Sequence, residues 1–424
     1  MERKRKYVIK GRKPLKGEIE VSGAKNASLP AICATLLSPG VYKLKRVPKV
    51  KDVFCMLKIM EHLGAVCEFE KDYLKIDTSK IKELSVPYEL ASQIRASILF
   101  LGALVGAYKS AEVPLPGGCA IGKRPVDFHI KGLSQLGAEI NLEKGNLIVK
   151  TQKLKGTTIV LDFPSVTATE NLMMAGVLAE GETIIKNSAK EPEVVFLGEM
   201  LKKMGAEIKG LGDDTIYIKG KKKLKPVNIE IIPDRIEAGT YLVLGALMEE
   251  NEIVVKNINK EHLKTPILKL EEMGITLERV DKNAFKVKRG KTINPVKIIT
   301  APYPGFPTDL QPFFAVLLTQ AEGISFITEN IFENRFLYVF ELKRMGADIE
   351  VKDRTAIING PTSLIGSPIK ATDLRAGAAL VLAGLCAENT TDVYNVELIE
   401  RGYENFVEKL SGVGAEIKVE EDED

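Results

Sequence analysis

The segment Leu115–Pro125 has the composition of a loop that could carry a reactive thiol. It holds Cys119 together with three glycines, two prolines and two adjacent cations, Lys123 and Arg124, and it follows neither a helical nor a strand period. Loops of this kind often carry function. Neighbouring cations favour the thiolate, which is the reactive form of cysteine. We therefore predict that Cys119 is exposed and reactive.

The other four cysteines are expected to be inert. Cys33, Cys55, Cys67 and Cys386 lie in apolar helical or strand patterns, where a free cysteine behaves as a small hydrophobic residue. The total of five is odd, with no CxxC pair and no histidine nearby at metal-ligand spacing. The sequence therefore predicts neither a disulfide framework nor a metal site, and it favours a reducing, cytoplasmic location.

Cations at the starts of apolar helices form a second set of chemistry-bearing residues. Lys25, Arg95, Arg235 and Arg375 fall in the first turns of expected helices, where a positive charge opposes the helix dipole. Helix N-termini favour anions, so several cations there suggest a bound anion. A salt bridge explains any single one of them equally well. Ser, Thr and Asp at these helix starts are expected to be N-caps; they lie in Ser22–Asn26, Ser92–Arg95, Ser165–Thr169, Pro233–Arg235, Pro307–Asp309 and Thr372–Arg375.

Several common kinds of site are disfavoured. The histidines, His62, His129 and His262, form no Ser/His/Asp arrangement, and His62 is expected on an exposed helix face. The chain has no GxxxxGK[ST] loop and no strand–GxGxxG–helix unit, which disfavours P-loop and Rossmann nucleotide binding. Lys and Arg number 60 against 57 Asp and Glu, a net charge of +3, so bulk charge does not indicate nucleic acid.

The elements that must position these residues belong to a chain of more than one domain. Its 424 residues exceed what one hydrophobic core usually holds, and 45% hydrophobic with 28% charged residues exclude a disordered chain. The longest apolar runs, near 98–107 and 376–387, are shorter than the roughly 18 residues of a membrane span. No apolar signal segment follows the basic start. We expect no membrane partner.

One short phrase, an apolar residue followed by glycine and usually alanine, recurs along the whole chain. Its glycines recur every 68 to 73 residues, at Gly64, Gly137, Gly205, Gly274, Gly346 and Gly414. Each ends an amphipathic segment, where a helix C-terminus favours a left-handed residue. Two short alternating segments then follow around a turn, the pattern of a hairpin. The repeating unit is therefore β-α-β-α-β-β, six times over.

The first helix of each unit is apolar on all sides, as in 172–178, 241–248 and 378–385, and is expected to be buried. The second helices carry Lys and Glu on one face and should be exposed. Three units that pack their apolar helices together would make one lobe with helices inside and sheets outside. Six units make two lobes, divided near Ile232-Pro233-Asp234. A linear solenoid is the structural alternative.

Together with the six repeats, several long motifs closely resemble the UDP-N-acetylglucosamine 1-carboxyvinyltransferase family of enolpyruvyl transferases. The resemblance covers essentially the whole chain. Its motifs are Gly23-Ala24-Lys25-Asn26, Pro116-Gly117-Gly118-Cys119, Arg124-Pro125-Val126-Asp127, Phe306-Pro307-Thr308-Asp309, Glu333-Asn334-Arg335-Phe336 and Arg401-Gly402-Tyr403-Glu404.

The resemblance implies an α/β fold, a two-lobed inside-out α/β barrel with three repeats per lobe. Residues 23–232 would form the first lobe, which carries the Cys119 loop, and residues 1–22 plus 233–424 the second, with the active-site cleft between them. It implies transfer of the enolpyruvyl group of phosphoenolpyruvate to the 3'-hydroxyl of UDP-N-acetylglucosamine by addition and elimination. Phosphate is released, no metal or organic cofactor is needed, and the product feeds peptidoglycan synthesis.

The resemblance also implies roles for particular residues. Cys119 would be the general acid that protonates the enol carbon, could form a covalent phosphoenolpyruvate adduct, and would be the target of fosfomycin. Asp309 would be the general base beside the sugar hydroxyl. Lys25, Arg124 and Arg401 would surround the phosphate and carboxylate, which suits their charge and geometry. The remaining cleft and UDP-sugar positions are Asn26, Arg95, Pro125, Val126, Asp127, Phe128, Ser165, Val166, Thr167, Ile331, Arg335 and Asp373. Before Ser165 this chain has Phe163-Pro164 where the family commonly has a lysine.

Two other functions are kept as alternatives. The sister enzyme that acts on shikimate 3-phosphate shares the fold and the phosphoenolpyruvate chemistry, but it lacks the cysteine loop of Pro116–Arg124. A non-catalytic repeat protein could instead bind RNA phosphates through its helix starts. The net charge of +3, only 6% aromatic residues and the reactive-looking loop count against that interpretation.

Overall fold

The computed structural model describes residues 5–116 and 126–421, which form two compact units. Described residues from Gly23 to Ile232 form the continuous unit, and those up to Ser22 together with those from Pro233 onward form the discontinuous unit. Cys119, Arg124 and Pro125 lie outside the described residues. Within the described ranges, no helix is both long and apolar enough to cross a membrane.

The described part of the continuous unit has three sheets around buried helices. Their strand orders are β13-β3-β5-β4, β11-β12-β10-β9 and β6-β8-β7. The strands are β3 (Val41–Lys45), β4 (Val66–Phe69), β5 (Tyr73–Asp77), β6 (Ser110–Pro114), β7 (Glu139–Glu143), β8 (Asn146–Lys150), β9 (Thr158–Val160), β10 (Glu182–Lys186), β11 (Glu207–Lys209), β12 (Thr215–Lys219) and β13 (Asn228–Glu230). The helices are α1 (Lys25–Ala34), η1 (Thr35–Leu37), α2 (Lys51–Leu63), α3 (Tyr88–Ala91), η2 (Arg95–Leu99), α4 (Phe100–Tyr108), α5 (Asp127–Gln135), α6 (Val166–Gly176) and α7 (Pro192–Lys203).

The discontinuous unit repeats this plan. Its strand orders are β21-β22-β1-β23, β15-β16-β14-β2 and β17-β18-β20-β19 in the described chain. The strands are β1 (Arg5–Lys10), β2 (Lys16–Glu20), β14 (Glu252–Lys256), β15 (Ile275–Asp281), β16 (Ala284–Arg289), β17 (Lys297–Ile299), β18 (Gly323–Thr328), β19 (Asp348–Lys352), β20 (Thr355–Gly360), β21 (Pro368–Lys370), β22 (Thr390–Tyr394) and β23 (Glu416–Glu421). The helices are α8 (Arg235–Ala246), η3 (Lys260–Leu263), α9 (Lys264–Glu272), η4 (Thr308–Leu310), α10 (Gln311–Leu318), α11 (Val339–Arg344), α12 (Leu374–Cys386), η5 (Val396–Arg401) and α13 (Phe406–Gly412).

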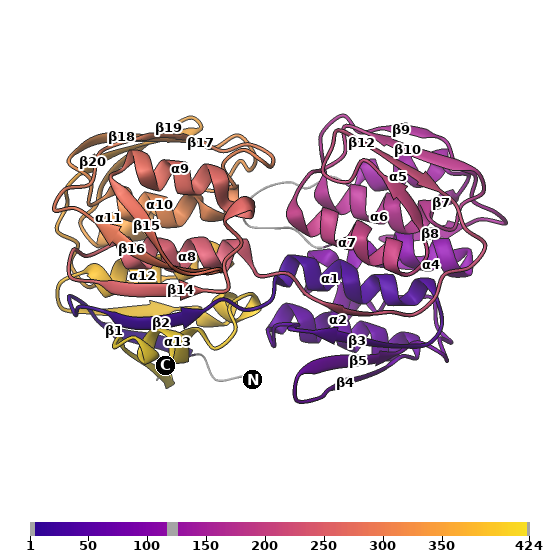
Figure 1. Ribbon diagram of the computed structural model, residues 1–424, viewed down its shortest axis with the longest axis horizontal. Coiled ribbons are helices and arrows are strands. Elements are labelled where there is room, and N and C mark those ends of the chain that lie inside the picture. The colour runs from indigo at the N-terminus through magenta and orange to yellow at the C-terminus, as the bar shows by residue number, and fades with distance from the viewer. Residues whose placement is uncertain (1–4, 117–125, 422–424) are drawn as a thin grey trace. The chain divides into compact units, whose positions relative to one another are not determined.

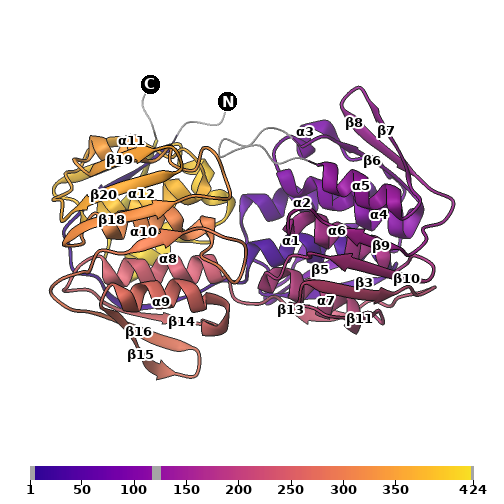
Figure 2. The same cartoon turned by 90° about the horizontal axis from the view of Figure 1, so that it is seen from above.

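The helices that are apolar on all sides lie inside, and the sheets surround them. In the discontinuous unit, α8, α10 and α12 pack on one another with almost every side chain buried. Figure 1 shows them behind the sheet strands, and Figure 2 shows the same layering from above. In the continuous unit α1, α4 and α6 hold the same place. Each unit has its own hydrophobic core, which confirms the prediction of helices inside and sheets outside.

The repeats exchange their first strands where the chain passes between the units. Strand β2 leads into α1 of the continuous unit, but it pairs in parallel with β14 of the discontinuous unit. Conversely, β13 pairs with β3 and then leads into α8. At the two crossings, the Asp234 amide donates to the Ser22 carbonyl at 2.9 Å, and the Ala24 amide to the Ile232 carbonyl at 2.7 Å.

The linear solenoid is ruled out by the pairing of the chain ends. Strand β1 pairs with both β22 and β23, so the discontinuous unit includes both ends of the described chain. In the continuous unit, its last strand, β13, likewise pairs with its first, β3. Such closure of each unit is incompatible with repeats that contact only their nearest neighbours.

The recurring glycines have the predicted left-handed conformation. Their φ angles lie between +84° and +109°, at Gly64, Gly137, Gly205, Gly274, Gly346 and Gly414. One repeat departs from the expected strand count, because the sheet of β6, β7 and β8 has three strands. In place of a fourth strand there is a single bridge between Ser85 and Glu112, because Pro87, two residues after Ser85, is the N-cap residue of α3.

The predicted N-caps are only partly correct. Ser165, Asp234 and Asp373 accept hydrogen bonds from backbone amides at the starts of α6, α8 and α12. Ser92 is instead the C-cap residue of α3, and the N-cap of α1 is Ala24, which has no side-chain oxygen. Extended backbone at Ala24 begins α1 without a side-chain cap.

Candidate active site

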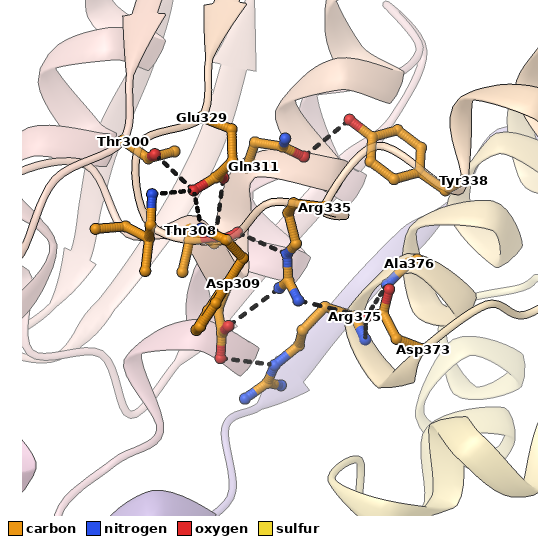
Figure 3. A network of polar contacts seen from close by, with 12 residues as sticks. Thr300, Thr308, Asp309, Gln311, Glu329, Arg335, Tyr338, Asp373, Arg375 and Ala376 are labelled. Carbon is orange, nitrogen blue, oxygen red and sulfur yellow. Dashed lines mark hydrogen bonds and ion pairs between the residues drawn. The ribbon is translucent and has the colours of Figure 1, made fainter. Parts of the chain in front are cut away.

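Asp309 is the centre of a charged network in the discontinuous unit, drawn in Figure 3. Its Oδ1 accepts a hydrogen bond from Arg335 Nη2 at 3.0 Å, and its Oδ2 accepts one from Arg375 Nε at 3.2 Å. Asp373 Oδ1 lies 3.6 Å from Arg335 Nη1. The structure therefore brings together three residues expected at the site, Asp309, Arg335 and Asp373, and adds Arg375.

Local structure fixes each member of this network. Asp309 lies in the short helix η4, which begins after Pro307 and is followed directly by α10 at Gln311. Pro312, the second residue of α10, is suited to the first turn of a helix. Asp373 is the N-cap of α12 and accepts from the amides of Arg375 and Ala376. This cap holds Arg375 in the first turn of α12, from which its side chain reaches Asp309.

The two arginines of this network are more deeply buried than the aspartate. The side chains of Arg335 and Arg375 are 1% and 3% exposed, whereas that of Asp309 is 28% exposed. Burial opposes the charge of Arg375, but Tyr403, Asp309 and Asp234 outweigh it and raise its pKa. Two buried, permanently charged guanidinium groups thus hold a carboxylate that faces outward, and they favour its ionised form.

Arg401 is the last residue of the short helix η5 in the discontinuous unit. The following turn brings Tyr403 under Arg375, whose guanidinium carbon lies 5.3 Å from the ring centroid. The Tyr403 hydroxyl lies 2.8 Å from Thr240 Oγ1. Gly402 has no room for a side chain, since an added Cβ would lie 2.7 Å from Leu374. Arg401 is half-buried in the discontinuous unit.

Lys25 is a buried cation in the continuous unit. It is the first residue of α1, and its Nζ lies 2.9 Å from Oδ2 of Asp52 in the first turn of α2. Both side chains are almost fully buried, and the next residue, Asn26, is half-buried. A salt bridge, the other explanation for a cation at a helix start, is therefore present at Lys25, with Asp52, and at Arg375, with Asp309. Neither pair excludes an anion, because each cation has further donor hydrogens.

His129 joins several expected substrate residues in the continuous unit. Its Nδ1 lies 2.8 Å from Asn171 Nδ2, which can only donate, so Nδ1 is the acceptor of a neutral ring. Its Nε2 then donates to Thr167 Oγ1 at 3.3 Å. Burial and the nearby charge of Arg95 lower the pKa of His129 to about 3.

The residues around His129 lie at two helix starts. Val126 is the N-cap residue of α5, with Asp127 and Phe128 in the first turn. Ser165 caps α6, accepting from the Ala168 amide at 3.4 Å, and is followed by Val166 and Thr167. The structure thus gathers Thr167 and Arg95 around His129, at the starts of α6 and η2.

The remaining cysteines have the inert surroundings expected from the sequence. Cys33, Cys55 and Cys386 are buried and Cys67 is half-buried. Burial raises the pKa of the Cys33 thiol, and it raises those of Cys67 and Cys386 to about 12. None of these three thiols ionises readily near neutral pH.

Sequence inspection alone did not assign several polar residues that the structure links to the site. Asp52 and His129 each contact an expected site residue from another part of the chain, and Glu329 accepts from the amide of Ile331, two residues further on. The sequence indicated Arg375 as a cation at a helix start, but it did not indicate that Arg375 contacts Asp309. Among the described residues, no group of three or more His, Cys, Asp or Glu could hold a metal ion. The cations suit an anionic ligand instead.

Comparisons with known proteins agree over nearly the whole chain. The model of the family described as EPSP synthase (3-phosphoshikimate 1-carboxyvinyltransferase) matches residues 9–410. UDP-N-acetylglucosamine 1-carboxyvinyltransferase 2 of Carboxydothermus hydrogenoformans is 49% identical over 414 residues, which cover 97% of this chain and 99% of that relative. UDP-N-acetylglucosamine 1-carboxyvinyltransferase of Halothermothrix orenii is 51% identical over 413 residues, with the same coverages.

Solved structures show the same fold. The enolpyruvyl transferase NikO from Streptomyces tendae has a TM-score of 0.89 and 25% identity, over 99% of this chain and all of that chain. An EPSP synthase from Acinetobacter baumannii has a TM-score of 0.77 at 22% identity, over 98% of this chain and all of that one, and supports the fold alone. The α/β architecture with internal helices is therefore that of the enolpyruvyl transferases.

Proposed function

This chain belongs to the UDP-N-acetylglucosamine 1-carboxyvinyltransferase family, and we propose that it transfers the enolpyruvyl group of phosphoenolpyruvate to the 3'-hydroxyl of UDP-N-acetylglucosamine, releasing phosphate. The observation that carries the proposal is the close match to relatives of that name, at 47–51% identity over 97% of the chain. The match favours this acceptor over shikimate 3-phosphate, the acceptor of the sister enzyme.

The reaction proceeds by addition and then elimination. Cys119 gives its proton to the terminal enol carbon, and the 3'-oxygen bonds to the adjacent carbon, while Asp309 takes the proton of the hydroxyl. The resulting ketal then loses a proton from its new methyl group and phosphate as the leaving group, which restores the double bond. The Cys119 sulfur can also bond to that central carbon and form a covalent adduct. The chemistry uses no metal or organic cofactor.

Different charged residues bind different chemical groups of the two substrates. Lys25, Arg124 and Arg401 bind the phosphate and carboxylate of phosphoenolpyruvate, because multiple donors and positive charge match both groups. Asp309, held by Arg335 and Arg375 at 3.0 and 3.2 Å, faces the sugar hydroxyl. Asn26, Arg95 and Asp373 complete the polar surroundings of the substrates.

The nucleotide sugar is held by the remaining positions. Arg124–Phe128, Ser165–Thr167 and Ile331 contact it, and His129 orients the Thr167 hydroxyl at 3.3 Å. Before Ser165 this chain has Phe163 and Pro164 where the family commonly has a lysine, so no cation contacts the nucleotide from these two positions. The enzyme acts in the cytoplasm, and its product enters peptidoglycan synthesis, on which cell shape and division depend.

A phosphate-release assay with paired acceptors tests the proposal. Phosphoenolpyruvate with UDP-N-acetylglucosamine should release phosphate, with EDTA present or absent, and shikimate 3-phosphate should not replace the sugar nucleotide. Release with shikimate 3-phosphate alone would establish the sister activity instead. No release with either acceptor, together with tight and strongly salt-dependent RNA retention on filters, would favour the RNA-binding alternative.

The role of Cys119 is tested by its reactivity. Fosfomycin, an epoxide, should add once to the chain when UDP-N-acetylglucosamine is present, as read by intact mass, and C119A should prevent the addition. C119A should also lower turnover by at least about 100-fold, the usual share of a general acid. C67A, at a thiol whose pKa burial raises to about 12, is the matched control and should behave as wild type. Wild-type turnover by C119A would refute the acid assignment.

A further inference from the structure

We propose that Glu329 is a positioning residue that sets the separation between Asp309 and Ile331, two of the positions expected to contact the acceptor sugar. This inference rests on the proposed function, because both of those roles do. Glu329 follows β18 directly and is only 1% exposed. Figure 3 shows its carboxylate between Thr300 and Thr308.

The Glu329 carboxylate receives four hydrogen bonds. Oε1 accepts from Thr300 Oγ1 at 2.9 Å, from the Ile331 amide at 2.7 Å and from the Phe332 amide at 3.1 Å. Oε2 accepts from Thr308 Oγ1 at 2.9 Å. A buried carboxylate is costly unless its oxygens are well supplied with donors, and four donors meet that condition.

These donors come from three separate segments. Thr300 lies just past the end of β17, Thr308 begins η4 and immediately precedes Asp309, and Ile331 lies in the segment after β18. Thr308 is fixed a second time, because its carbonyl accepts from Arg335 Nε at 3.3 Å. Glu329 therefore ties the backbone before Asp309 to the backbone at Ile331.

This link matters because a general base must lie close to the proton that it removes. A displacement of about 1 Å can lower the rate about 100-fold. The acceptor sugar would meet Asp309 at one point and Ile331 at another, so the distance between these points decides whether the 3'-hydroxyl reaches the carboxylate. A shift would lower kcat and spare binding of phosphoenolpyruvate by Lys25, Arg124 and Arg401.

Two substitutions at Glu329 separate a positioning role from a role of its charge. E329Q keeps the length, and its amide group can donate to Thr308 Oγ1, a hydroxyl that can also accept. E329D keeps the charge but is one methylene too short to reach all three segments. Positioning predicts kcat within about threefold of wild type for E329Q and at least tenfold lower for E329D, with an unchanged KM for phosphoenolpyruvate. The reverse order would overturn the proposal.

Thr308 provides a second test if E329D fails to fold. T308V removes only the Glu329–Thr308 hydrogen bond and should lower kcat at least tenfold, whereas T308S keeps the hydroxyl and should restore it. T355V is the matched control, since it breaks the 2.9 Å contact of Thr355 with Thr328 between β20 and β18. Equal kcat values for T308V and T355V would overturn the proposal.

All rates are measured with the acceptor that the wild-type enzyme uses. Failure of the proposed function would appear in the wild type, as turnover with shikimate 3-phosphate in place of UDP-N-acetylglucosamine. Failure of the positioning role would appear in the ratios of variant to wild type. The two failures are therefore distinguishable.

Discussion

The side chain of Asp309 is oriented by hydrogen bonds from two neighbouring arginines. Both of its oxygens accept from buried guanidinium groups, which keeps the carboxylate ionised and fixes its direction. Its catalytic value therefore depends on being aimed at the hydroxyl, and a substrate group must compete with Arg335 or Arg375 for it.

Replacing Asp309 by asparagine should lower kcat by at least about 100-fold, because the amide keeps the shape but cannot accept the proton. The KM for phosphoenolpyruvate should change little. D392N, which breaks the 2.9 Å ion pair of Asp392 with Lys6 elsewhere in the same unit, should retain turnover. Thermal melting of both variants completes the test: if D309N loses cooperative melting together with activity, Asp309 is a structural residue.

The sequence revealed individual site residues better than their partners. The helix-dipole rule indicated Lys25 and Arg375 as unusual cations, but Asp52 lies 27 residues from Lys25 and Asp309 lies 66 residues from Arg375. No local pattern connects residues so far apart. Glu329 was missed for the same reason, since its hydrogen bonds with Thr300 and Thr308 join segments 29 and 21 residues away.

At the scale of the elements, the repeat was the most informative signal. Glycine at a helix end has a local cause, the left-handed conformation, so Gly64 and its five counterparts predicted where helices stop. Helices that are apolar on all sides predicted the interior. The missing strand beside β6 could not be foreseen as easily, because it depends on Pro87 being the N-cap residue of α3 immediately after Val86.

His129 joins α5 to α6, and this contact should depend on pH. The ring is neutral in the folded chain because its pKa is lowered to about 3, whereas an unfolded histidine has a pKa of about 6.5. Below pH 6.5 the unfolded state binds a proton that the folded state does not. His129 therefore stabilises the fold less as the pH falls from about 6.5 towards 3.

Urea unfolding at pH 7.5 and pH 5 measures this effect. Wild type should lose about 2 kcal/mol of stability through His129 over this interval, at about 1.4 kcal/mol per pH unit below 6.5. H129Q lacks the titrating ring, so its free energy of unfolding should not fall in this way. The difference in free energy of unfolding between wild type and H129Q should therefore be about 2 kcal/mol smaller at pH 5 than at pH 7.5. H62Q, at an exposed position, is the control and should follow wild type. A pH-independent difference between H129Q and wild type would contradict the prediction.

At the scale of the whole molecule, the exchange of β2 and β13 makes the two units unequal. Among the described residues, the core of the continuous unit lies between Ala24 and Ile231, and its strands pair only with one another. The discontinuous unit instead depends on the start of the chain. There β1 is an inner strand of one sheet and β2 an edge strand of another, and Tyr7, Ile9 and Ile19 enter the core.

This asymmetry predicts different behaviour for fragments of the chain. A fragment of residues 23–232 should fold alone and melt cooperatively, because its core and sheets are complete. A fragment of residues 233–424 should not, because loss of β1 leaves β22 unpaired on one side and β23 without its partner strand, and it removes buried side chains. Rejoining residues 1–22 after residue 424 through a flexible linker should restore cooperative melting, as measured by circular dichroism. If the fragment 233–424 melts cooperatively without residues 1–22, then β1 and β2 are not needed for this unit to fold, and the prediction is wrong.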